Sequence, residues 1–235
     1  LAPRLRHDVD VPNPLPEPVD AVVDLADLNL AGVELEGEPG HGWLRLGATT
    51  TLSALADDTA CRQALAGEAL AEAARYAAAL NQRNAATVAG ALLGADSANE
   101  LLLLLLALGT EAEVMDAAGT RTLPIQQLAD LSAGSLVTRI SIPWPTQAAR
   151  GALARVARTP TDEPLIAAAG VCEGDRCMVA VGGLCAVPLV FDGSGDLMAA
   201  LAAAAADHPV RSDWLGSAEY RREMAQILAK RVAGK

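Results

Sequence analysis

The chain has 235 residues, of which 51% are hydrophobic and 20% are charged, and its formal net charge is −11. This composition excludes an intrinsically disordered protein and leaves room for one large domain or two modest ones. The acidic balance argues against nucleic acid or an anionic membrane as the main partner, because both repel a negatively charged surface.

The first half of the chain is predicted to alternate between short strands and helices. Residues 1–18 are rich in proline and should be extended or irregular, and no secretory signal is visible there. Ala21–Leu25 is a short β-like run, and Gly42–Gly47 alternates apolar and polar residues as a half-buried strand does. The elements expected next are a helix that opens at Thr49, a helix over 65–80, a structured loop over 81–94, a buried apolar helix over 98–108, and strands over 112–116, 121–124 and 137–142.

Pro143 and Pro145 mark a domain boundary in the sequence. Beyond it, strands are expected over 166–172 and 177–181, joined by a turn, with a further strand near Pro188. Helices are expected over 197–206 and 217–232, the second with Ser217 as its N-cap. The predicted fold class is therefore α+β with antiparallel strands.

Residues that could carry chemistry by themselves are scarce. The four cysteines form no C-x-x-C pair and are predicted to be free thiols: Cys61, Cys172, Cys177 and Cys185. No histidine lies beside a serine or cysteine nucleophile, so a hydrolytic triad is unsupported, and no metal site is expected. Any redox chemistry would have to come from a bound cofactor.

Two segments have the character of phosphate-binding turns. Gly47–Thr50 is a turn from a strand into a helix, and the segment over 81–94 contains glycines and a hydroxyl residue beside exposed backbone. Helix N-termini attract anions through their free amides, so two such turns could clamp a pyrophosphate. Loops of this kind more often only connect elements, and that alternative stays open on physical grounds.

Several ordered motifs resemble the FAD-binding subunits of the molybdenum hydroxylases, of the carbon monoxide dehydrogenase and xanthine dehydrogenase type. The segments that carry the resemblance are 44–50 (LRLGATT), 83–90 (RNAATVAG), 111–116, 119–124, 138–143, 155–162, 181–183 with Pro188, and 217–221. Motifs in the right order and separation are more specific than any one of them alone.

The resemblance implies a fold of two parts: a two-subdomain FAD-binding (PCMH-type) domain over 1–144, N-terminally truncated and without its first phosphate loop, and a small α+β domain with an antiparallel sheet over 148–235. It implies FAD as cofactor, no metal of the chain's own, and a cytoplasmic complex with an iron–sulfur small subunit and a molybdopterin large subunit. The flavin would take electrons from the iron–sulfur clusters and pass them to an external acceptor. The cofactor-binding positions implied are Gly47, Ala48, Thr49, Asn84, Thr87, Val88, Gly90, Glu100 and Ile140.

The chain departs from the family pattern at specific positions. Leu1–Arg6 resembles the residues just after the family's A-G-G-T-[DS]-L loop, so that loop is not expected within the 235 residues given. In the R-N-x-A-T-[IV]-G-G-N loop, Ala89 replaces the first glycine and Ala91 replaces the asparagine. Glu100 stands where the family has aspartate, and Arg155 where lysine is common. Two main interpretations remain: an FAD-dependent electron-transfer subunit, or a flavin-free structural or assembly subunit of such a complex. A truncated fragment and a flavin oxidase of the wider superfamily are weaker alternatives.

Overall fold

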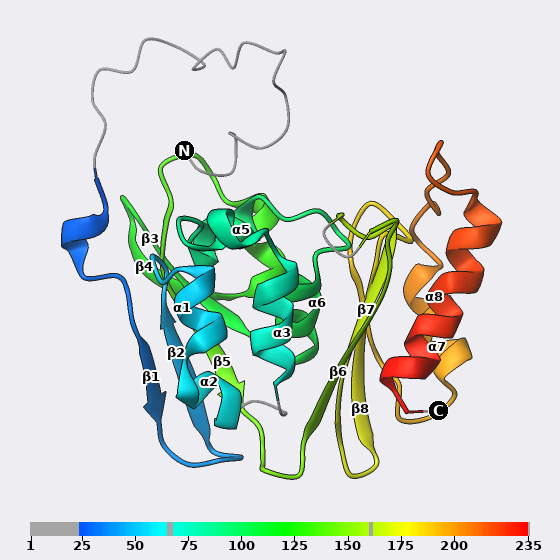
Figure 1. Ribbon diagram of the computed structural model, residues 1–235, viewed down its shortest axis with the longest axis horizontal. Helices are drawn as coiled ribbons and strands as arrows, with labels where there is room; N and C mark the ends of the chain where they lie inside the picture. The colour runs from blue at the N-terminus through cyan, green and yellow to red at the C-terminus, as the bar shows by residue number, and fades with distance from the viewer. Residues whose placement is uncertain (1–23, 65–67, 160–161, 235) are drawn as a thin grey trace.

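The computed structural model describes residues 24–64, 68–159 and 162–234, which form four layers (Figure 1). A five-stranded sheet forms one outer layer, and a group of short helices packs against its inner face. A four-stranded sheet lies on the other side of those helices, and the last two helices cover its outer face. The α+β class with antiparallel sheets is confirmed.

The first sheet is antiparallel throughout, in the order β1-β2-β5-β3-β4. Its strands are β1 (Val33–Glu36), β2 (Gly42–Gly47), β3 (Glu111–Asp116), β4 (Gly119–Pro124) and β5 (Leu136–Trp144). The alternation in β2 is confirmed, because Leu44 and Leu46 are fully buried on the inner face while Trp43 and Arg45 are only partly buried on the other.

The helical layer follows β2. It contains α1 (Leu52–Asp57), α2 (Thr59–Ala64), α3 (Ala69–Tyr76), α4 (Leu80–Arg83), α5 (Val88–Leu93) and α6 (Glu100–Ala107), and 3₁₀ turns lie at Ala26–Leu28 and Ile125–Asp130. The prediction of one loop over 81–94 was wrong, since most of that segment is α4 and α5. Helix α5 is short and contains a glycine, so the sequence pattern did not predict it. In the structure Thr87 caps this helix by accepting a hydrogen bond from the Gly90 amide.

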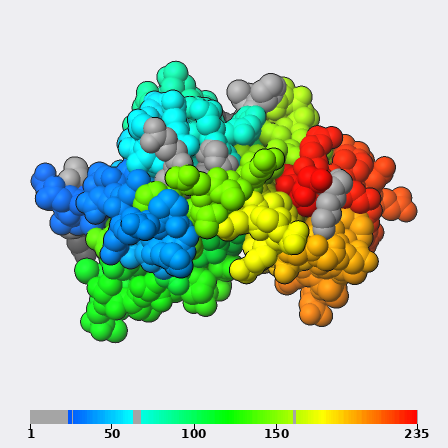
Figure 2. Space-filling view, turned by 90° about the horizontal axis from the view of Figure 1, so that it is seen from below, coloured from blue at the N-terminus to red at the C-terminus, as the bar shows by residue number. Residues whose placement is uncertain are grey.

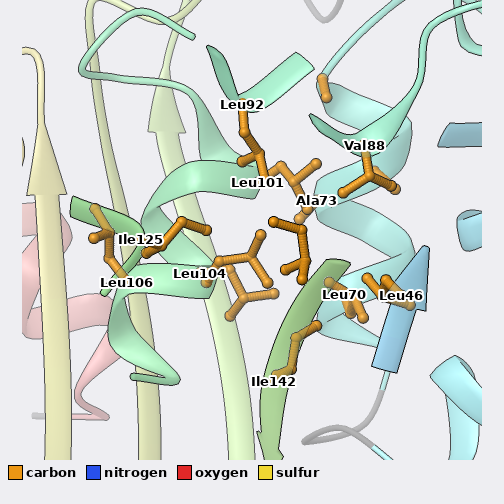
Figure 3. Close-up of a cluster of buried hydrophobic side chains, with 14 of the residues drawn as sticks. Leu46, Leu70, Ala73, Val88, Leu92, Leu101, Leu104, Leu106, Ile125 and Ile142 are labelled. Carbon is orange, nitrogen blue, oxygen red and sulfur yellow. The ribbon is translucent and has the colours of Figure 1, made fainter. Parts of the chain in front are cut away.

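Helix α6 is the centre of the core (Figure 3). Its leucines are buried on nearly every side, and the close-up shows Leu101, Leu104 and Leu106 in one cluster with Ile142 of β5. The same buried cluster includes Ala167 and Ala169, which belong to the second sheet. A helix that is apolar all round is expected to be buried on all sides, and α6 meets that expectation by packing between two sheets.

The second sheet and its two helices make up the other end of the molecule (Figure 2). The strands are β6 (Arg150–Val156), β7 (Ile166–Glu173), β8 (Arg176–Gly182) and β9 (Leu189–Asp192), and the helices are α7 (Leu197–Ala205) and α8 (Ala218–Val232). The Ser217 hydroxyl oxygen accepts a hydrogen bond from the Tyr220 amide and so caps α8, as predicted. The sequence interpretation missed β1 and β6. Strand β1 alternates apolar and acidic residues but is only four residues long, and β6 has no clear alternation. Most of the β-like run at Ala21–Leu25 lies outside the described residues.

The prediction of four free cysteines was wrong for two of them. Cys172 and Cys177 are joined by a disulfide across β7 and β8, while Cys61 and Cys185 are buried free thiols. The bonded pair is separated by a tight turn, so its proximity depends on strand register rather than on a spacing motif. Burial raises the pKa of the Cys61 thiol to about 12, which keeps it protonated and unreactive.

Gly182, at the end of β8, is expected to tolerate no side chain. A Cβ at this position would lie 1.9 Å from the carbonyl oxygen of Ser97, just before α6. We therefore expect Gly182→Ala to lower the free energy of unfolding by about 2 kcal/mol through overpacking, measured by urea denaturation. Gly195→Ala is the control, since nothing lies within 4 Å of its added Cβ. Equal stability of the two variants would contradict this close approach.

Candidate functional site

The two turns singled out in the sequence lie against each other. The Leu52 amide donates to the Ala86 carbonyl (2.9 Å), and the Val88 amide donates to the Thr50 carbonyl (2.8 Å). The Ala89 amide donates to the Ala48 carbonyl (3.1 Å). The segments 47–51 and 86–90, which are far apart in sequence, therefore form one paired-turn unit at the start of α1 and α5.

Three side chains bring polar groups to the paired-turn unit. Thr87 keeps its hydroxyl hydrogen for donation, because its oxygen only accepts from Gly90. Asn84 is exposed, and its carboxamide oxygen accepts a 2.6 Å hydrogen bond from Ser53, which leaves the amide nitrogen without an acceptor among the described residues. Thr49 is half-buried, and only its backbone amide, which donates to Leu30, has a partner among the described residues. These donors could meet phosphate or hydroxyl oxygens of a ligand.

The two glycines of the unit have different reasons to be glycine. A Cβ on Gly47 would lie 2.3 Å from the Leu30 carbonyl oxygen, so packing within the chain already requires glycine there. A Cβ on Gly90 would meet only the Thr87 hydroxyl, at 3.0 Å. Gly90 therefore keeps the first turn of α5 open above the threonine hydroxyl.

Other predicted positions are buried in the core. Ala48 is 3% exposed, and Val88 and Ile140 are fully buried, so these side chains face the helical layer. Ile140 lies opposite Leu46 in the register of β2 and β5. Only backbone groups of these residues could reach a ligand.

Glu100 lies at a separate place, where α6 begins beside β6. Its carboxylate is 3.0 Å from the guanidinium of Arg155, and the side chains of the pair are 3% and 15% exposed. The Arg155 guanidinium also lies over the ring of Tyr76, 5.0 Å from its centroid, and donates to the Asp162 carbonyl. Burial raises the pKa of Glu100, although Arg155 opposes that rise.

A cavity of about 240 Å³ opens at this ion pair. It is lined by Tyr76, Glu100, Leu153, Ala154, Arg155 and Arg231, and by no residue of the paired-turn unit. Tyr76 and Arg231 were not among the predicted positions. They belong to α3 and α8, and they meet Glu100 only because both helices pack beside β6. No sequence motif therefore connects them with Glu100.

Metal ligation and membrane crossing have no support in the described part of the chain. Within it, no group of three or more His, Cys, Asp or Glu side chains is arranged to hold a metal ion. None of the helices over 24–64, 68–159 and 162–234 combines the length and apolar character needed to cross a bilayer.

A sequence model of the FAD binding domain in molybdopterin dehydrogenase matches residues 15–145, more than half of the chain and all of the paired-turn unit. The chain belongs to this family. The structure agrees, because the chain superposes with a TM-score of 0.75 on a reconstituted carbon monoxide dehydrogenase from Oligotropha carboxidovorans, at 25% identity over 87% of this chain and 77% of that one. Quinoline 2-oxidoreductase from Pseudomonas putida 86 gives 0.67, with 26% identity over 85% of this chain and 75% of that one.

One characterised protein is also similar in sequence. It is the alpha subunit of the 6-hydroxypseudooxynicotine dehydrogenase complex of Paenarthrobacter nicotinovorans, 28% identical over 189 residues. The match covers 71% of this chain and 64% of the relative, so the chain spans less than two thirds of that protein.

The described residues fit FAD in their side-chain chemistry. Thr49, Asn84 and Thr87 offer hydrogen-bond donors, and residues 89–91 carry no side chain larger than a methyl group that would block close approach. The backbone fits less well, because the first three amides of α5 are already bonded within the chain. A diphosphate at this turn would have to be held by side chains more than by helix amides.

Proposed function

We propose that this chain is the FAD-binding electron-transfer subunit of a molybdopterin-containing dehydrogenase or hydroxylase. In this role it accepts electrons from the iron–sulfur clusters of a small subunit. Those clusters receive the electrons from a molybdopterin large subunit, and this chain passes them on to an external acceptor. The observation that carries the proposal is the family match across residues 15–145, which includes both paired turns. A cytoplasmic location belongs to the same proposal.

The proposal assigns distinct tasks to the residues of the chain. Backbone groups of Gly47, Ala48, Val88 and Ile140 would border the cofactor, while Thr49, Asn84, Thr87 and Gly90 would hold its phosphate and sugar oxygens. Glu100, held by Arg155 beside an aromatic ring, would accept a hydrogen bond from a ribose hydroxyl or from the ring system. FAD, when bound, supplies the electron-transfer chemistry of this site.

A second candidate function is a flavin-free structural or assembly subunit of such a complex. It is favoured by the backbone of α5, whose first amides are bonded to Thr50, Ala48 and Thr87 rather than left for a phosphate. Ala89 and Ala91, where the family has glycine and asparagine, favour it as well.

The two candidates differ in whether the assembled complex contains flavin. We expect the chain, co-expressed and purified with its partner subunits, to absorb at about 450 nm as oxidised flavin does, and to release FAD on acid precipitation. A correctly assembled complex with no absorbance there and no releasable FAD would establish the structural subunit instead. A stable isolated monomer that recruits no iron–sulfur or molybdopterin subunit would contradict both candidates, because both place the chain in such a complex.

Thr87 provides a residue-level test of the site. We expect Thr87→Ala to weaken FAD binding by about 1 kcal/mol, roughly fivefold in dissociation constant, because a donor to the cofactor is lost. The matched control is Ser217→Ala, which removes the equivalent cap from α8, outside the paired-turn unit, where Ser217 accepts from the Tyr220 amide. An equal loss of affinity in both variants, measured by fluorescence titration, would assign the effect to helix capping and exclude Thr87 from the site.

A further inference from the structure

We infer that Cys172 and Cys177 form a reversible thiol–disulfide pair, at which a small-molecule disulfide such as oxidised glutathione can oxidise this chain. The site lies on the outer face of the second sheet, near the turn between β7 and β8, and is separate from the flavin site proposed above. It is a site of covalent modification, independent of whether the chain binds FAD.

Strand register holds the two cysteines together in either redox state. They lie directly opposite each other in a hairpin of seven residue pairs that runs from Ala167↔Gly182 to Glu173↔Arg176, and their Cα atoms are 4.0 Å apart. The hairpin closes through a two-residue turn, and β7 is also paired along its other edge with β6. Breaking the bond therefore leaves both sulfurs in place, and reforming it requires no refolding.

The two sulfurs differ in access and in electrostatics. Cys177 is 5% exposed and packs in the core beneath α7 and α8, whereas Cys172 is only half-buried. Arg150 of β6 lies directly opposite Cys172 and points to the same face, because paired residues on neighbouring strands share a face. Because Cys172 is the more exposed of the two and has a cationic residue on its face of the sheet, it is the sulfur that exchanges with solutes, and Cys177 is the one that resolves the intermediate.

The exchange balances in two steps. The Cys172 thiolate attacks one sulfur of oxidised glutathione, whose S–S bond breaks and releases one glutathione thiolate. The Cys177 thiol then loses its proton and attacks the Cys172 sulfur, which releases the second glutathione. The pair loses two electrons and two protons, and two reduced glutathione molecules carry them away; excess reduced glutathione drives the reverse reaction.

The full chain, equilibrated at pH 7.5 in glutathione mixtures, acid-quenched, alkylated and analysed by peptide mass spectrometry, tests this pair. We expect one two-electron transition, with the fraction oxidised following the ratio of oxidised glutathione to the square of reduced glutathione. Cys177→Ser should accumulate glutathione on Cys172, and Cys172→Ser should leave Cys177 unmodified. A pair that stays oxidised in excess reduced glutathione, stays reduced in excess oxidised glutathione, or is modified equally at either cysteine would overturn the inference.

Arg150 gives an independent readout. In the Cys177→Ser background, Arg150→Gln should slow alkylation of Cys172 at pH 7.5 by about threefold, because it removes a positive charge from the face of the sheet that carries Cys172. The control is Arg176→Gln, an arginine that is also exposed and is adjacent to Cys177 in sequence, but on the opposite face of β8. Equal alkylation rates in the two variants would show that Arg150 does not activate Cys172 and would overturn the asymmetry.

Discussion

Replacing Arg221 with methionine is expected to lower the free energy of unfolding by about 3–5 kcal/mol, because it leaves buried acceptors without a donor. Arg221 is 1% exposed, and its guanidinium holds Asp213 with two hydrogen bonds of 2.8 and 2.7 Å. It also donates to the carbonyls of Leu165 (3.0 Å), Gly183 (2.7 Å) and Gly216 (3.4 Å). One side chain thereby connects the start of α8 to the ends of β7 and β8.

Arg222 provides the matched control for this substitution. It is the neighbouring residue on α8, it is exposed, and it makes no hydrogen bond or ion pair among the described residues. Arg222→Met should change stability by less than about 0.5 kcal/mol, as surface substitutions usually do. Urea denaturation followed by circular dichroism measures both variants, and a loss below about 1 kcal/mol for Arg221→Met would refute its role as the connecting donor.

Arg155→Met is expected to cost about 3 kcal/mol at pH 7, because it leaves the buried Glu100 carboxylate without its cation. Burial already raises the pKa of Glu100, and loss of Arg155 raises it further. A carboxyl group whose pKa is higher in the folded than in the unfolded state binds its proton more tightly when folded. Stability therefore falls as pH rises from the unfolded pKa through the folded pKa. The penalty of Arg155→Met should thus be larger at pH 7 than at pH 4.

A double variant separates the charge effect from lost packing. In Glu100→Gln/Arg155→Met the buried site carries no charge, so about half of the loss at pH 7 should be recovered. The double variant should also lose the additional pH dependence between pH 4 and pH 7. If Arg155→Met is equally costly at both pH values, the ion pair contributes nothing and the arginine acts through its contacts with Tyr76 and the Asp162 carbonyl.

Much of the fold could be predicted from periodicity. The strand at Gly42–Gly47 was predicted with its observed bounds, and the helices over 98–108 and 217–232 differ from α6 and α8 by a residue or two at their ends. These elements have a buried face or a capping residue that acts locally. Strand β6 could not be predicted in this way, since only Ala154 of Arg150–Val156 is buried and the strand therefore shows no period-two burial pattern.

The candidate site was predictable only where a motif is continuous in sequence. The segments around Gly47 and Thr87 were identified separately, but their hydrogen-bonded pairing depends on how α1 and α5 pack. The association of Glu100 with Arg155 across 55 positions of sequence was not predicted, although both residues were noted as departures from the family pattern. The partners Tyr76 and Arg231 come from other elements and left no signal in the sequence.

The position of α6 between the two sheets has a consequence for cooperativity. Since its buried cluster includes Ile140 and Ile142 from one sheet and Ala167 and Ala169 from the other, separating either sheet would expose part of this helix to water. The two sheets are therefore expected to unfold together, and the amides of α6 should be among the last in the chain to exchange with solvent hydrogen. Heating should unfold the described parts of the molecule in a single transition, in which α6 is the last element to be exposed to solvent.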